Sequence, residues 1–434
     1  MKAAVIALIW ALTAVIGSAG CRAEVSEDVS FMVFGDPAEY AAYKELVAAF
    51  EESHPSIDIE LQYVPSQGDY RQRLAAGFSG GDPPDVMLIN YRRFSAIASQ
   101  DGLEPLTSYV NSSELISSDD FYPISLESFQ WQDEQWCLPQ NVSSLVVYYN
   151  RELFDLAGIP YPDDQWNWID FLNTARSLTS DTDGDGRTDV YGLGMTPNIF
   201  RLAPFLWQNG GALVDSQENP SRLTLDTPAA NDAFQWFVEL QVKEQVTPDA
   251  VAEIAENSQS RFLNGRLGMI LNSRRGVPTY RTIDSFEWDI APLPAGRRPA
   301  GILHSDGYCM AAASENKDAA WQFIEYANSP AGQTIVARSG RTVPSLIAVA
   351  ESDAFLDPKL DPKNARVFID AIPLLQRVPT MSTWAAIEEI VSREIERAYY
   401  GDVSVVEAAE AAIDRTSEYF DLEKFELENF KPDQ

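Results

Sequence analysis

The sequence has few of the residues from which many enzyme and metal sites are built. Its 434 residues include only three cysteines and two histidines, His54 and His304. Three cysteines do not make a disulfide scaffold, and two histidines cannot build a histidine-based zinc site. The phosphate-binding P-loop and the dinucleotide-binding G-x-G-x-x-G pattern are also missing. These absences remove several common classes of catalytic site.

Basic residues are scarce as well. The chain has 32 Lys and Arg against 65 Asp and Glu, which gives a formal net charge of −33. Proteins that bind nucleic acid need clustered basic side chains to neutralise phosphates. The charge balance therefore argues against a nucleic-acid partner and predicts a solvated acidic surface.

Long apolar runs are confined to the N-terminus. Residues 3–20 carry no charge and follow Lys2, the pattern of a signal peptide. The run ends in "SAGC" at Cys21, and the chain then becomes polar. This end resembles a bacterial lipobox, so we expect residues 1–20 to be removed and Cys21 to carry a lipid. A plain signal peptide or an uncleaved membrane anchor are the alternatives. The rest of the chain is expected to be exported and held at the membrane, in the periplasm or on the cell surface.

The remaining chain alternates between strand and helix patterns. Residues 29–35 read as a strand, and Asp36 with Pro37 and Glu39 reads as a helix start. Residues 56–64 alternate as a second strand, and "PPDVMLIN" ends in an apolar strand of the parallel type. This order continues to about residue 340 without a linker or repeat, which predicts an α/β fold.

Several motifs, in order, resemble those of one family. They are "PPDVMLINYRRFSAIASQDGLEPL", "WCLPQNVSSLVVYYN", "WNWIDFLNTARSLT", "WQNGGALVD", "SRFLNGRLGMIL", "IAPLPAG", "SENKDAAWQFIEYANSPAGQ" and "RSGRTVPS". Together they are similar to the extracellular solute-binding proteins of ABC importers, the group that includes maltose-binding protein. The resemblance implies a two-lobed periplasmic-binding-protein type II fold with a hinge between the lobes.

The resemblance also implies where the chain passes between the lobes. One lobe would hold residues 28–143 and 308–345, and the other residues 144–307 and 346–434. Asn150 would cap the helix after the first crossing and Gly158 would end it. Cys137 and Cys309 would both lie near crossing strands. We expect them to be ordinary buried thiols, with a single bridge as the alternative.

A carbohydrate site needs planar hydrogen-bonding groups and a few aromatic faces. By resemblance, the ligand-binding candidates are Gly35, Asp36, Asn90, Tyr91, Gln140, Asn141, Trp207, Gly210, Asn272, Ser273, Arg274, Asp306, Gly307, Tyr308, Arg341 and Trp384. Some of these have structural alternatives. Trp207 and Trp384 could be core aromatics, Asp36 a helix cap and Asn272 a turn residue, whereas Arg274 and Arg275 could be solvated or bind an anion.

One acidic loop stands apart from these candidates. "DTDGDGRTD" places Asp181, Asp183, Asp185 and Asp189 at the ligand positions of an EF-hand-like loop, with the Arg187 carbonyl between them. Calcium is thus the one cofactor that the sequence suggests, although Gly192 occupies the position of the usual glutamate. A plain acidic turn is the alternative.

Three function classes follow. The first is a non-catalytic, monomeric binding protein that delivers a carbohydrate or polyol to an ABC permease, with a glycerol-phosphate binder as a variant. The second is an exported glycoside hydrolase, and the third is a structural lipoprotein. The resemblance favours the first class and does not identify the solute.

Overall fold

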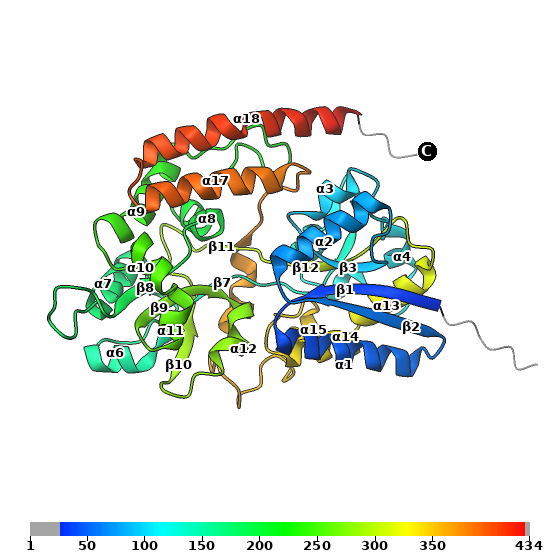
Figure 1. Ribbon diagram of the computed structural model, residues 1–434, viewed down its shortest axis with the longest axis horizontal. Helices are drawn as coiled ribbons and strands as arrows, with labels where there is room; N and C mark the ends of the chain where they lie inside the picture. Colours follow the sequence, from blue (N-terminus) through cyan, green and yellow to red (C-terminus); the bar gives the residue numbers. More distant parts are fainter. Residues whose placement is uncertain (1–26, 430–434) are drawn as a thin grey trace, which may run out of the picture.

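The protein folds into two α/β lobes that lie side by side (Figure 1). The structure, a computed structural model, describes residues 27–429. The predicted leader of residues 1–20 and the lipidation candidate Cys21 lie outside this range. Within it, every helix is too short or too polar to cross a bilayer.

The first lobe is built on a five-stranded sheet in the order β2-β1-β3-β12-β6. β1, β2 and β3 are parallel, and β12 runs antiparallel to both β3 and β6. Its elements are β1 (Glu27–Phe34), α1 (Pro37–Ser53), β2 (Ile57–Val64), α2 (Gln67–Gly80), β3 (Val86–Asn90), α3 (Phe94–Ala98), α4 (Thr107–Ser112), η1 (Ser118–Asp120), α5 (Pro123–Glu127), β4 (Gln130–Trp131), β5 (Glu134–Gln135), β6 (Cys137–Pro139), β12 (Asp306–Met310), α13 (Lys317–Ala327) and α14 (Pro330–Arg338).

The second lobe is built on a four-stranded sheet in the order β10-β7-β9-β8. β8 and β9 are parallel, and β7 runs antiparallel to its neighbours. Its elements are β7 (Leu145–Asn150), α6 (Arg151–Ala157), α7 (Trp168–Leu178), β8 (Tyr191–Gly194), α8 (Ile199–Gln208), α9 (Pro228–Val242), α10 (Ala250–Ala255), α11 (Ser258–Leu263), β9 (Leu267–Ser273), η2 (Arg274–Gly276), α12 (Val277–Tyr280) and β10 (Trp288–Ala291).

The C-terminal part packs mainly on the second lobe. α17 contacts α8, α9 and α18, and in Figure 1 both α17 and α18 run along the top towards the first lobe. The remaining elements are β11 (Gly301–Ile302), α15 (Ile347–Ala350), α16 (Val367–Asp370), η3 (Ile372–Leu374), β13 (Leu375–Gln376), α17 (Trp384–Tyr399) and α18 (Val405–Asn429).

Local sequence signals explain where several helices begin and end. The Asp36 carboxylate accepts hydrogen bonds from the backbone N–H groups of Ala38 and Glu39, and Pro37 follows it, so Asp36 caps α1 as predicted. Asn150 caps α6 in the same way, and Gly158 ends it with a φ of 66°. The predicted caps are therefore confirmed at both helices.

The chain leaves the first sheet after β6 and returns to it at β12. The two crossing segments lie against each other, since Ser143 and His304 exchange backbone hydrogen bonds of 2.9 and 2.8 Å. The Val142 N–H also donates to the Val343 carbonyl, which adds a third segment. Short paired segments of this kind are where a hinge between lobes can bend.

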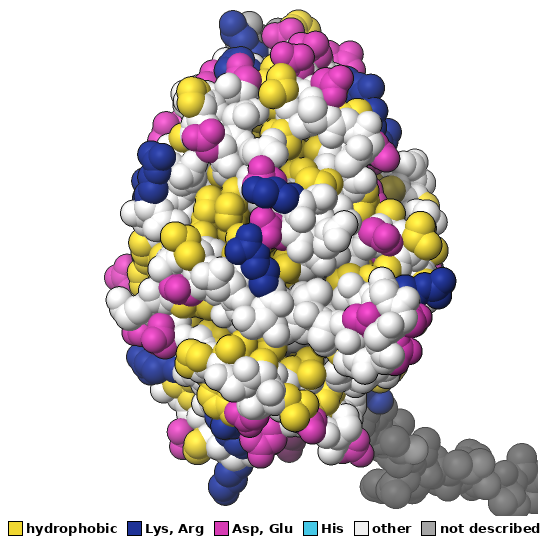
Figure 2. Space-filling view, turned by 90° about the vertical axis from the view of Figure 1, so that its left-hand side faces the viewer, with side chains coloured by type: hydrophobic (Ala, Val, Ile, Leu, Met, Phe, Trp, Pro, Cys, Tyr) yellow, Lys and Arg dark blue, Asp and Glu magenta, His cyan; other side chains and the backbone are white. Residues whose placement is uncertain are grey.

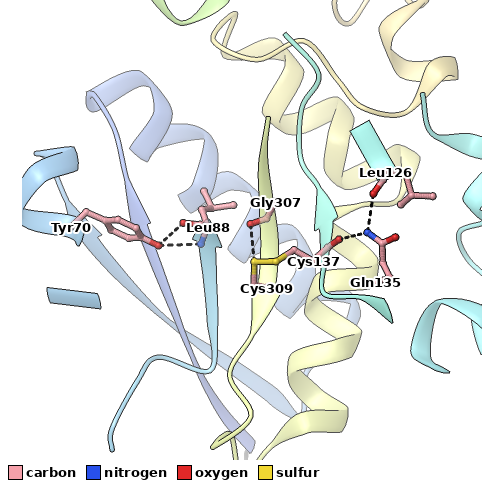
Figure 3. The surroundings of a disulfide bond; sticks show 7 residues. All are labelled: Tyr70, Leu88, Leu126, Gln135, Cys137, Gly307 and Cys309. Carbon is pink, nitrogen blue, oxygen red and sulfur yellow. Dashed lines mark hydrogen bonds between the residues drawn. A yellow bond between two sulfur atoms is a disulfide. The ribbon is translucent and has the colours of Figure 1, made fainter. Parts of the chain in front are cut away.

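Cys137 and Cys309 form a disulfide, so the expectation of ordinary thiols was wrong. The two residues lie opposite each other on β6 and β12, with their Cα atoms 4.4 Å apart (Figure 3). That distance is within the range that a disulfide spans. The Cys309 sulfur also lies 3.6 Å from the Gly307 carbonyl oxygen, a contact rather than a hydrogen bond because a disulfide sulfur carries no proton. The bridge joins the two strands that lead into and out of the hinge.

The outer face of the second lobe fits the acidic composition. Figure 2 shows Asp and Glu side chains spread over this face among apolar ones, with Lys and Arg in small separate groups.

Candidate functional site

The site lies where strand ends of both lobes meet. β1 and β3 end at Phe34 and Asn90 in the first lobe, and β8 and β9 end at Gly194 and Ser273 in the second. Ligands of α/β proteins bind at the carboxyl ends of parallel strands. The guanidinium of Arg275, which follows β9, lies 5.1 Å from the ring centre of Phe34, so these edges face one another across an interlobe cleft.

The wall of the first lobe encloses a cavity of about 800 Å³. It is formed by α2, α3 and the end of β3, and residues of α8 and α17 cover it from the other lobe. Representative lining residues are Phe34, Gln67, Asn90, Arg92, Phe200 and Glu388. The cavity is large enough for a small saccharide, and it presents both planar polar groups and aromatic rings.

A chain of polar side chains runs along the back of this wall. The Asn90 amide donates to the Asp306 carboxylate at 3.0 Å, and the Asp306 N–H donates to the Asn141 side-chain oxygen at 3.3 Å. The Gln140 amide donates to the hydroxyls of Tyr43 and Tyr308. The Asn141 amide donates to the Gln140 side-chain oxygen at 3.4 Å and joins the two parts. Five predicted residues, from three separate parts of the chain, thus belong to one network beside the hinge.

Arg92 bridges the lobes. Its guanidinium carbon lies 3.7 Å from the ring centre of Phe200 on α8, and its Nε lies 3.5 Å from a Glu388 oxygen on α17. Arg93 takes the other Glu388 oxygen at 3.0 Å. Nε and Nη1 of Arg92 are buried and have no hydrogen-bond partner among the described residues. Nε keeps its ion pair with Glu388, so Nη1 is the donor of the stacked Arg92 that has no partner among the described residues.

Asp36, Glu39 and Arg341 form an ionic cluster beneath Gly35. Arg341 lies 2.5 Å from carboxylate oxygens of both acids. Burial raises the pKa of Glu39 to about 7, despite the opposing effect of Arg341. Gly35 has a φ of 146°, and a Cβ there would lie 1.7 Å from Glu39 Oε2, so only glycine fits above the cluster.

The wall of the second lobe holds a cavity of about 370 Å³ at the ends of β8 and β9. Thr196, Arg201, Ser258 and Asn272 are among its lining residues. The Asn272 amide donates to the Tyr280 hydroxyl at 2.8 Å, and its side-chain oxygen accepts from the Ser273 N–H. Asn272 thus lines a cavity as well as fixing the end of β9.

Arg274 is a structural link between the lobes. It is buried between the rings of Phe355 and Phe368, and its Nε donates to the Gly340 carbonyl at 2.8 Å. Burial lowers its pKa to about 9. The solvated alternative is therefore wrong for Arg274.

The predicted aromatic and glycine residues take varied places. Trp207 lies near the C-terminal end of α8, is buried, and its carbonyl accepts from Arg298. Gly210 follows in a turn with a φ of 85°. Trp384 is completely buried, and its indole N–H has no partner among the described residues. This burial favours the core alternative for both tryptophans.

The other predicted residues on strands are also buried. The Tyr91 hydroxyl accepts from the Val378 N–H at 3.3 Å, which again joins the two lobes. Tyr308 is completely buried on β12, and a Cβ on Gly307 would lie 2.8 Å from the Phe129 ring. These residues shape the wall from behind.

Several residues that line the cavities were not among the predicted candidates, including Gln67, Arg92, Phe200 and Arg201. Phe200 and Arg201 lie in the first turn of α8, directly after β8. The signal was available, because Asn198 is a good helix cap after the apolar strand "YGLG".

The sequence "GFSGG" at residues 77–81 matches the G-x-S-x-G pattern of hydrolases. In those enzymes the serine lies on a sharp turn between a strand and a helix. Here the segment is the C-terminal end of α2, and Ser79 is exposed. The match is therefore not a nucleophile elbow.

The acidic loop lies on the surface of the second lobe. One carboxylate oxygen each from Asp181, Asp183 and Asp189 can be chosen so that all lie within 4.8 Å of one another. Backbone N–H groups of Gly186 and Gly184 lower the pKa of Asp181, and Thr182 lowers that of Asp189. The Asp185 carboxylate instead accepts from the Arg187 N–H at 2.8 Å.

The fold and cleft define a two-lobed binding protein, and the comparisons agree. An ABC substrate-binding protein from Listeria monocytogenes in complex with cycloalternan superposes with a TM-score of 0.83, at 22% identity over 91% of this chain and 98% of that one. A solute-binding protein from Thermotoga lettingae bound with tagatose gives 0.80, at 20% identity over 91% and 100%.

Relatives by sequence are similar in kind. A putative binding protein of Brucella abortus is 23% identical over 84% of this chain and 87% of its own length. A mannitol-binding protein of Pseudomonas aeruginosa is 24% identical over 86% and 89%. The family model for bacterial extracellular solute-binding proteins matches residues 35–334. The chain belongs to this family.

Proposed function

We propose that the protein captures a carbohydrate, either a sugar or a polyol, in the interlobe cleft and delivers it to an ABC permease. The lipid on Cys21 would keep it at the membrane. The observation that carries the proposal is the cavity of the first lobe, where Asn90 and Gln67 lie beside the rings of Phe34 and Phe200. A sugar-binding site needs amide groups that hydrogen-bond the sugar hydroxyls and aromatic rings that pack against its C–H faces.

Family membership supports a binding role without chemistry. The carboxylates around the cleft already have partners, since Asp306 is held by Asn90 and Glu388 by two arginines. Binding alone needs only contacts that form between solute and protein. A micromolar solute has about 8 kcal/mol available, which hydrogen bonds and ring contacts can supply.

The test is a thermal-shift screen over sugars and polyols, followed by chromatography of the recovered solute. A solute that binds only the folded state raises the melting temperature. We expect at least one sugar or polyol to do so and to be recovered intact. Recovery of a cleaved sugar would indicate a hydrolase, and a panel without any shift would contradict the proposal.

We also propose that the loop of residues 181–189 binds calcium weakly. The close approach of three carboxylates, two exposed and one half-buried, supports this, because such groups repel each other unless a hard cation lies between them.

A further inference from the structure

Arg201 is a cation at the cleft edge of the second lobe. It lies in the first turn of α8, where the Asn198 side chain accepts from its backbone N–H at 3.1 Å. This cap fixes the start of the helix beside the ends of β8 and β9. The Arg201 side chain lines the cavity of about 370 Å³ together with Thr196 and Asn272.

The guanidinium of Arg201 has no partner of its own. No ion pair or side-chain hydrogen bond of Arg201 occurs among residues 27–429, and its Nε is buried without a partner. Burial, against the opposing effect of Tyr280 and with a smaller contribution from nearby Arg92, lowers the pKa of Arg201 to about 10. Arg201 as a whole is half-buried, and its Nε–H is the buried donor that lacks an acceptor. An acceptor from outside the chain would therefore stabilise it.

The nearby carboxylates are occupied elsewhere. Glu253 lines the same cavity, but its two oxygens accept from the N–H and the hydroxyl of Ser258 at 2.8 and 2.7 Å. Glu388 is held by Arg92 and Arg93. His304 adds no negative charge, and its pKa is lowered by burial and by Arg92 and Arg201. Neither of these two carboxylates therefore forms an ion pair with Arg201.

We propose that Arg201 binds an anionic substituent, a carboxylate or a phosphate, on the carbohydrate that occupies the cleft. This inference rests on the proposed function and narrows its solute class to acidic sugars. A guanidinium presents parallel N–H groups that match both oxygens of a carboxylate or phosphate, whereas a sugar hydroxyl accepts much less. Arg92 stacks on the neighbouring Phe200, and its Nη1 is a second donor without a partner among the described residues that can serve the same solute.

The test compares matched pairs of probes by calorimetry and thermal shift. The pairs are glucuronate with glucose, galacturonate with galactose, and glucose 6-phosphate with glucose, all at constant ionic strength. We expect at least one acidic member to bind tenfold or more tightly than its neutral partner. Tighter binding of a uronate would indicate a carboxylate on the solute, and tighter binding of glucose 6-phosphate would indicate a phosphate.

Arg201→Gln should then remove the preference and weaken the acidic probe at least tenfold. Since the variant removes the buried Nε–H that has no acceptor, its melting temperature without solute should equal or exceed that of the wild type. Arg201→Lys keeps the positive charge but loses the parallel N–H groups of the guanidinium. It should bind the acidic probe with an affinity between those of the wild type and Arg201→Gln. The control is Arg298→Gln. Arg298 donates to the Trp207 carbonyl near the C-terminal end of α8, away from Arg201, so this variant should leave binding unchanged.

Three results would overturn the inference. Neutral sugars that bind while every acidic probe fails at millimolar concentration would exclude an anion but leave carbohydrate binding intact. Equal losses of acidic and neutral binding in Arg201→Gln would show that Arg201 only shapes the site. If no probe and no other sugar binds, both the inference and the proposed function fail.

Discussion

At the scale of single residues, the cluster of Glu39, Asp36 and Arg341 makes a pH-dependent contribution to stability. Its members join the start of α1 to the segment after α14, and Arg341 also donates to the Arg275 carbonyl of the other lobe at 3.2 Å. Glu39 is buried in this cluster, so its contribution to the free energy of unfolding depends on whether its carboxyl group is protonated.

The first prediction concerns Glu39. Its pKa is raised to about 7 in the folded protein, above the ordinary value of 4.5, so the folded state holds the proton more tightly. The stabilising contribution is complete below pH 4.5 and is lost as the pH rises towards 7. We therefore compare the free energy of unfolding of Glu39→Gln with that of the wild type. The difference, variant minus wild type, should increase by at most about 3 kcal/mol as the pH rises from 4.5 to 7. Urea titrations at several pH values measure it.

Because the comparison is a difference, the titration of His304 and of other carboxylates cancels. Glu45→Gln on the exposed side of α1 is the matched control and should show a flat difference. A flat difference for Glu39→Gln as well would contradict the assignment.

Sequence reasoning at this scale succeeded where a side chain acts on its own backbone. The caps Asp36 and Asn150 follow from local patterns, and both are confirmed. Arg201 and Phe200 could not be ranked in this way, because their importance depends on which helix turn meets the cleft. The burial of Trp384 depends likewise on the packing of helices far apart in sequence.

At the scale of elements, the disulfide ties β6 to β12. Gln135 supports the same region by donating to the carbonyls of Leu126 and Cys137 (Figure 3). Pairing of the cysteines depends on the register of two strands that are 172 residues apart in sequence, which no local pattern reveals. The sequence could therefore predict the strands but not the bridge.

The second prediction concerns this bridge. Replacing both cysteines by alanine should lower the free energy of unfolding by up to about 5 kcal/mol, because the closed loop restricts the unfolded chain. Melting curves with and without reductant measure the effect. Reductant should destabilise the wild type and leave Cys137→Ala with Cys309→Ala unchanged. A wild type that melts identically under both conditions would show that the bridge contributes nothing.

The third prediction concerns the acidic loop after α7. If it binds calcium, calcium should raise the melting temperature relative to chelator, and Asp183→Ala with Asp185→Ala should abolish the rise. The control Asp232→Ala removes an exposed carboxylate from α9, and this variant should still show the calcium-dependent rise in melting temperature. Identical wild-type melting curves in calcium and in chelator would contradict calcium binding and would favour the alternative, a plain acidic turn.

At the scale of the whole molecule, two chain crossings separate two sheets whose strand ends face each other. The alternation of strands and helices predicted the α/β class, and the order of motifs predicted the two lobes. The positions of α17 and α18 across the top had no comparable signal, because amphipathic helices can cover either lobe (Figure 1). A solute that contacts both lobes would favour a closed arrangement of them.

The most direct test of the central claim, that a carbohydrate binds between the lobes, is amide hydrogen exchange with and without the most stabilising sugar of the screen. Exchange reports local opening, and contacts with a solute suppress it. The account predicts protection in two separate segments, residues 88–93 of the first lobe and residues 195–202 of the second, with little change on the outer helix α6. Protection confined to one lobe, or found only on the outer surface, would contradict it.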